Sequence, residues 1–112
     1  MKTIKYILLL FFIITINAQE MSTISGFVRD DATGEPISYA NVFLSETSIG
    51  SATNVDGYFV ITYVPPGSYQ LLASMIGFEI HKEDVNIAEN ENIRINIRLR
   101  QAVLEGAEVT VT

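Results

Sequence analysis

The chain has 112 residues, no cysteine and a formal net charge of −6. No disulfide framework can support the fold, and the length allows one small domain. The excess of acidic residues argues against nucleic acid and anionic membrane surfaces as partners.

The first 18 residues are built unlike the rest of the chain. Lys2 and Lys5 precede an apolar run, YILLLFFII, over residues 6–14. A bilayer-spanning helix needs about 20 apolar residues, whereas a secretory signal needs about 7 to 15 followed by a small-residue cleavage site. Because Ala18 suits that site, we expect residues 1–18 to be a signal peptide that is removed on export. A retained N-terminal membrane anchor is the alternative.

Short alternating runs separated by turn residues fill the next part of the chain. Residues 23–30 (TISGFVRD) are typical of a strand in which Gly26 lets a neighbouring backbone come close. The turn formers of residues 30–36 end this strand. Residues 39–45 and 49–54 are expected to form the second and third strands, each bounded by small polar residues.

Two turn signals frame the fourth strand, expected over residues 57–64. The Asp-Gly pair at 56–57 supplies the positive φ values of a tight hairpin, which predicts that it joins the third strand to the fourth. The Pro-Pro-Gly sequence at 65–67 stops the fourth strand and reverses the chain. A fifth strand follows over residues 68–76, where Tyr69 is expected to place its ring in the core and its hydroxyl on nearby backbone.

The clearest pattern lies near the end of the chain. Residues 92–100 (NIRINIRLR) alternate isoleucine or leucine with polar residues, which predicts one strand with a buried and a wet face. Residues 79–87 supply another strand, joined to it by a polar turn at 88–91. About seven short strands without a helix predict an all-β fold, a single antiparallel β-sandwich with Greek-key connections. The expected core includes Ile24, Val28, Val42, Leu44, Phe59, Ile61, Tyr69, Leu71, Ile95 and Ile97.

Few side chains offer catalytic or metal chemistry. His81 is the single histidine, which excludes a zinc site with paired imidazoles, and we interpret it as a solvent-facing strand residue. Asp30, Asp31 and Glu35 share one loop, where calcium binding is conceivable, but Asx turns explain such aspartates without a metal. We therefore expect no catalytic residue, no cofactor and no metal.

Six motifs follow one another between residues 24 and 78: ISGFV, TGEPI, ANV, TNVDGYF, PPGSY and IGF. In this order they resemble the carboxypeptidase-regulatory-like domain, a transthyretin-like or prealbumin-like β-sandwich. The resemblance spans residues 23 to about 100, so residues 19–103 are expected to form this domain. It implies a non-catalytic role as an N-terminal extension of TonB-dependent outer-membrane receptors, on the periplasmic side of the outer membrane.

The tail, residues 104–112 (LEGAEVTVT), offers a partner site. Its last five residues are similar to a TonB box, the extended segment that follows such an N-terminal domain, with threonine in place of a usual valine at 110. The resemblance implies a periplasmic TonB-type energy-transducing protein as partner, beside the receptor's own plug and barrel, which this chain would lack as a fragment. The box-like residues are Glu108, Val109, Thr110, Val111 and Thr112.

Two alternatives remain open for the tail and for the whole chain. The alternative for the tail is that Val109 and Val111 form the closing strand of the sandwich. The chain also fits a stand-alone or multidomain exported sandwich that binds a glycan or a protein through its exposed loops.

Overall fold

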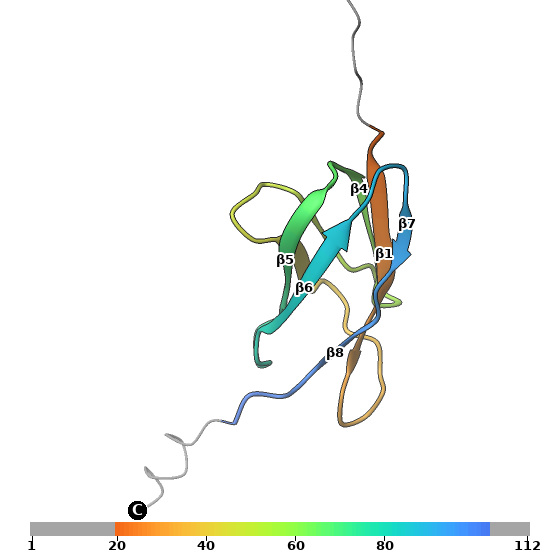
Figure 1. Ribbon diagram of the computed structural model, residues 1–112. Coiled ribbons are helices and arrows are strands. Elements are labelled where there is room, and N and C mark those ends of the chain that lie inside the picture. The colour runs from red at the N-terminus through yellow and green to blue at the C-terminus, as the bar shows by residue number, and fades with distance from the viewer. Residues whose placement is uncertain (1–19, 104–112) are drawn as a thin grey trace, which may run out of the picture.

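A computed structural model describes residues 20–103, which form two packed β-sheets and no helix (Figure 1). The all-β sandwich predicted from the sequence is therefore confirmed. Residues 1–18, the predicted signal peptide, lie outside the described residues. Over residues 20–103, no helix is long and apolar enough to cross a membrane. The strands are β1 (Ser22–Asp30), β2 (Asn41–Leu44), β3 (Gly50–Ala52), β4 (Tyr58–Val64), β5 (Gly67–Ser74), β6 (His81–Ile87), β7 (Asn92–Arg94) and β8 (Ile97–Leu99).

The two sheets differ in the direction of their strands. One has the order β3-β2-β5-β6, and all its pairs are antiparallel. The other has the order β4-β1-β7, with β8 pairing the second half of β1, and in it β7 and β8 run parallel to β1. The prediction of a purely antiparallel sandwich was wrong at this point. After β6 the chain crosses to the other sheet and continues beside β1 in the direction of β1.

The single strand predicted over residues 92–100 is in fact two short ones. Between them the Ile95 amide donates to the Ser25 carbonyl at 2.8 Å, while the Phe27 amide donates to the side-chain oxygen of Asn96 at 3.1 Å. A side chain thus replaces a backbone acceptor, and the ladder is interrupted. Gly26 faces this interruption, where a Cβ atom would lie 2.6 Å from the carbonyl carbon of Ile95. The predicted close approach of a neighbouring backbone to Gly26 is confirmed.

The Asp-Gly turn at 56–57 is tight, as predicted, but it does not form a hairpin. The Asn54 amide donates to the Tyr58 carbonyl at 2.9 Å, and the Tyr58 amide donates to Oδ1 of Asn54 at 3.0 Å. Gly57 has a φ of 76°, the left-handed conformation that glycine favours. However, β3 pairs with β2 and β4 pairs with β1. The turn therefore carries the chain from one sheet to the other, where Phe59, Ile61 and Val64 of β4 join the core.

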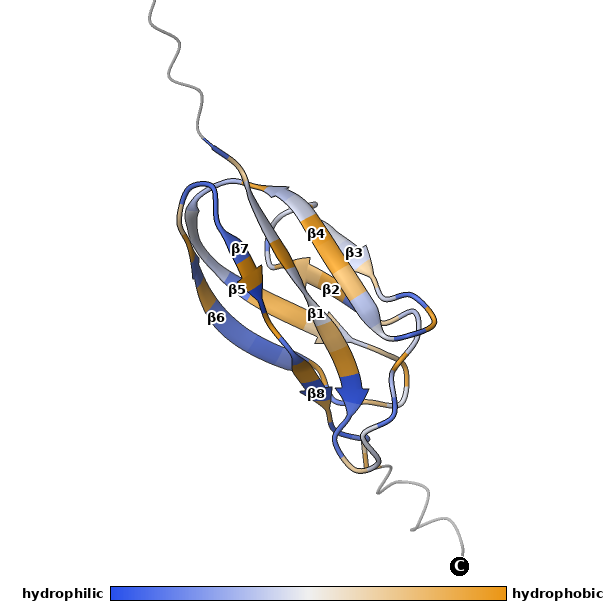
Figure 2. Cartoon of the chain, turned by 90° about the vertical axis from the view of Figure 1, so that its right-hand side faces the viewer, coloured by the Kyte–Doolittle hydropathy of each residue, from blue (hydrophilic) through white to orange (hydrophobic). Residues whose placement is uncertain are grey.

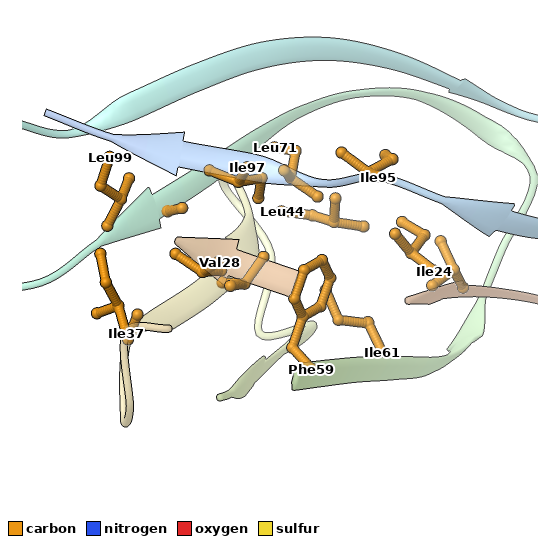
Figure 3. Close-up of a cluster of buried hydrophobic side chains, with 14 of the residues drawn as sticks. Ile24, Val28, Ile37, Leu44, Phe59, Ile61, Leu71, Ile95, Ile97 and Leu99 are labelled. Carbon is orange, nitrogen blue, oxygen red and sulfur yellow. The ribbon is translucent and has the colours of Figure 1, made fainter. Parts of the chain in front are cut away.

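The core lies between the two sheets, and Figure 3 shows its largest side chains meeting there. Phe59 is the largest of the fully buried side chains. Tyr69 is half-buried against the core, and its hydroxyl donates to the Pro65 carbonyl at 2.7 Å, which confirms the predicted role of this tyrosine. The other predicted core residues are all buried: Ile24, Val28, Val42, Leu44, Phe59, Ile61, Leu71, Ile95 and Ile97.

The two ends of the domain lie far apart. Because the first strand, β1, runs parallel to the last strands, β7 and β8, the chain enters the sandwich at one end and leaves it at the other. Figure 1 shows this arrangement, with the start of β1 at the top and the segment after β8 leaving at the bottom. We call such a domain in-line, because the chain enters it at one end and leaves it at the other.

Candidate functional sites

The box-like residues 108–112 lie outside the described residues, but the structure shows how the chain leaves the sandwich before them. The Ala102 amide donates to the Gly77 carbonyl at 2.8 Å, and Gln101 forms a bridge with Phe78. The Gln101 side chain also donates to Oδ2 of Asp30 at 2.9 Å. The segment after β8 is thus fixed to the loop between β5 and β6 and to the end of β1.

His81 lies at the start of β6 beside a polar hollow of about 400 Å³. Its Nε2 atom is 3.0 Å from Oε1 of Glu83, two residues along the same strand, and both side chains are about one third exposed. The hollow contains no hydroxyl or thiol that could act as a nucleophile beside this histidine. Its lining residues are Asp31, Glu79, Ile80, His81, Arg98 and Arg100.

The acidic loop after β1 uses its first aspartate to hold its own backbone. Asp30 is nearly buried, and its Oδ1 atom accepts the Ala32 amide at 2.8 Å, the Asx-turn arrangement predicted for this loop. The hydrogen bond from the Gln101 side chain and the one from the Ala32 amide lower the pKa of this carboxyl group. Within residues 20–103, no group of three His, Cys, Asp or Glu side chains could hold a metal ion.

Thr53 is a buried polar residue that the sequence analysis missed. Its hydroxyl donates to the Ile37 carbonyl at 2.7 Å and accepts the Ala40 amide at 2.9 Å. The Thr53 backbone adds two bonds, from its amide to the Ala40 carbonyl and from the Tyr39 amide to its carbonyl. Thr53 thus makes four hydrogen bonds to the segment before β2. The only feature of the sequence that points to Thr53 is its position directly before the Asn-Val-Asp-Gly turn. The alternation of apolar and polar residues does not indicate that its side chain is buried.

Tyr39, held by Thr53, borders an exposed apolar hollow of about 480 Å³. Its φ is +61°, a conformation that bulky side chains rarely adopt, and its side chain is 66% exposed. Ile76, in the loop between β5 and β6, is 95% exposed. The hollow is lined by Tyr39, Asn41, Ser74, Met75, Ile76 and Ile80.

Solved structures share this fold at low sequence identity. A chain of the type II cohesin–X-dockerin complex of Acetivibrio cellulolyticus is 21% identical with a TM-score of 0.61, over 71% of this chain and 58% of that chain. The pilus 2b backbone protein of group B streptococcus is 12% identical with a TM-score of 0.57, over 79% of this chain and 43% of that one. Catechol 1,2-dioxygenase of Pseudomonas arvilla C-1 is 13% identical with a TM-score of 0.61, over 85% and 57%. This chain thus spans about half the length of these proteins.

The fold is a β-sandwich, which is also found in a chain of a cohesin–X-dockerin complex, in a pilus protein and in an enzyme. Residues 24–111 match the CarboxypepD_reg-like domain family, and the chain belongs to this family. The family resemblance predicted from the motifs is confirmed. No curated protein matches the chain.

Proposed function

We propose that this chain is a non-catalytic accessory domain at the N-terminus of a TonB-dependent outer-membrane receptor, on the periplasmic side of the membrane. The observation that carries the proposal is the parallel pairing of β1 with β7 and β8. An in-line domain presents whatever follows it at the end opposite to its start. The segment that leads toward the box-like residues 108–112 therefore leaves the sandwich at the end opposite to the start of β1, which suits a tail that binds a partner.

The non-catalytic part of the proposal is supported by what the polar side chains do. Asp30 and Thr53 are buried; Asp30 accepts a backbone amide of its own loop, and Thr53 bonds backbone groups of the segment before β2. His81 contacts a carboxylate on its own strand and no candidate nucleophile. Membership of the CarboxypepD_reg-like family agrees with this interpretation.

In this role the tail binds a TonB-type protein by adding a strand to the edge of its sheet. Main-chain hydrogen bonds supply most of the affinity in this mode, and β-branched residues favour the extended backbone that it needs. A proline within the segment removes one backbone donor and disfavours the added strand.

The test compares two proline variants in the full-length receptor. Val109→Pro should abolish binding to the C-terminal domain of the TonB-type partner and stop nutrient uptake. Ala107→Pro places the same residue just before the segment and should leave both close to the parental level. Uptake and binding that survive Val109→Pro would refute the proposed role of the tail.

An exported adhesive module is the second candidate, and the exposed apolar hollow beside Tyr39 and Ile76 favours it. Such a module would bind a protein partner through the loops at that end. The coding sequence after Thr112 separates the two candidates. A plug and barrel would support the receptor, and a stop codon or another type of domain would support the adhesive module.

A further inference from the structure

The outer face of the sheet formed by β4, β1, β7 and β8 carries most of the positive charge of the described residues. Arg29 of β1, Arg94 of β7 and Arg98 of β8 each alternate with residues directed at the core, so all three belong to this outer face. Figure 2 looks onto this sheet and shows hydrophilic segments at β7, at β8 and at the end of β1. Lys82 lies on β6, in the other sheet, and Arg100 follows β8.

Two arginines of this face are neighbours, and none of the three forms an ion pair within the described residues. Arg29 and Arg98 are direct partners in the parallel register, and like charges placed opposite each other destabilise a sheet. Over residues 20–103 the ion pair found is that of His81 with Glu83, so none of these arginines has an acidic partner within 4 Å. Arg29 instead donates to the Gly34 carbonyl at 3.3 Å. Asp31 and Glu79 line a hollow together with Arg98, but no carboxylate in the described part of the chain lies within ion-pair distance of the three arginines.

Two aromatic rings lie next to these arginines on the same face. The Arg29 guanidinium lies 5.3 Å from the centre of the Phe27 ring, and the Phe27 and Tyr58 rings have their centres 5.0 Å apart. Both rings are partly exposed. Guanidinium groups bind carboxylates through two parallel hydrogen bonds, and aromatic rings add apolar contact area. The face thus combines guanidinium groups that can bind carboxylates with the apolar surface of two aromatic rings.

We propose that this arginine face, formed by Arg29, Arg94 and Arg98 with Phe27 and Tyr58, binds an acidic polypeptide segment of a partner protein. Arg94 and Arg98 are four residues apart, about 13 Å along the strand direction, which matches side chains i and i+4 of an extended peptide. An anionic bilayer fits less well. The net charge of the whole chain is negative, so an extended anionic surface would be repelled, whereas a short segment meets mainly the local positive field.

The test measures binding of a fluorescent decaglutamate peptide to the full chain at low ionic strength. Each exposed carboxylate–guanidinium pair contributes about 0.2–1 kcal/mol, so Arg94→Gln with Arg98→Gln should raise the Kd about 2- to 30-fold. Lys82→Gln removes one positive charge from the opposite sheet, and Arg98→Gln removes one from this face. The proposal requires the second change to weaken binding clearly more than the first.

Three outcomes would overturn the proposal. Equal weakening by Lys82→Gln and Arg98→Gln would show that only net charge matters, and undetectable binding of decaglutamate would remove the ligand class. Arginine-dependent binding of phosphatidylglycerol vesicles in place of the peptide would assign the face to a membrane. Circular dichroism and thermal unfolding of each variant confirm that it folds, which is expected because the substituted side chains are exposed.

Discussion

Replacing Gly26 with alanine tests the close approach of the segment between β7 and β8 to β1. A Cβ atom at this position would lie 2.6 Å from the carbonyl carbon of Ile95 and closer still to its oxygen. These are backbone atoms, so the segment between β7 and β8 must move away from β1. The movement breaks the bonds from the Ile95 amide to Ser25 and from the Phe27 amide to Asn96. Overpacking costs about 1–3 kcal/mol and each lost hydrogen bond about 1 kcal/mol, so we expect a loss of about 3–5 kcal/mol.

This loss is large for so small a domain. About 84 residues correspond to a total stability of roughly 4–12 kcal/mol, and each kcal/mol lowers the Tm by about 4–8 °C. Urea denaturation followed by circular dichroism measures the effect, with Gly34→Ala as the matched control. Gly34 has a φ of +77° but no atom near its missing Cβ, so alanine there should cost only about 1 kcal/mol of backbone strain. A larger loss for Gly34→Ala than for Gly26→Ala would refute the reasoning.

Three further predictions concern the core, a buried hydroxyl and a carboxylate. Phe59→Ala should lower the free energy of unfolding by about 3–5 kcal/mol, because it leaves a cavity in the core. The next residue, Val60, is 39% exposed on the opposite face, so Val60→Ala should lower it by less than about 1 kcal/mol. Equal losses in urea denaturation would contradict this. Thr53→Val keeps the shape but leaves the buried Ala40 amide without its acceptor, so calorimetry should show a loss of about 1–3 kcal/mol, and an unchanged Tm would disprove it. The folded-state pKa of Asp30 is lowered, so its stabilisation is complete above the unfolded-state pKa of about 3.9 and is lost as the pH falls through the folded-state value. Denaturation series from pH 6 downward should therefore show the advantage of the parent over Asp30→Asn shrinking below about pH 4, and a constant difference would contradict the assignment.

Alternation along the chain predicted which side chains are buried but not which strands are neighbours. The pattern of residues 92–100 correctly assigned Ile95 and Ile97 to the core, because burial of one face imposes a period of two residues. The same pattern is compatible with any pairing partner and either direction, so the parallel pairing with β1 could not be predicted. The break at Asn96 depends on one side-chain hydrogen bond to Phe27, a tertiary contact that leaves no mark on the pattern.

In the candidate sites, too, contacts between residues close in sequence could be predicted, whereas contacts between distant strands could not. The Asx turn of Asp30 and the hydroxyl contact of Tyr69 follow from local sequence, and both were predicted. The pairing of Arg29 with Arg98 joins residues from the two ends of the domain. It depends on the register of β8, which no local rule determines. The arginine face could therefore not be predicted from the sequence, which shows each arginine but not that they lie side by side.

The parallel pairing of the first and last strands also decides how the domain responds to mechanical force. A pull applied to its two ends acts along β1 and β8 in opposite directions, so it loads the hydrogen bonds between these strands in shear, all at the same time. Antiparallel terminal strands pulled from the same end would instead unzip one bond after another. Resistance to such a pull is governed by the rate of unfolding rather than by the equilibrium stability. Under the proposed function, a partner that pulls on the tail would transmit its force through the sandwich before the sandwich unfolds.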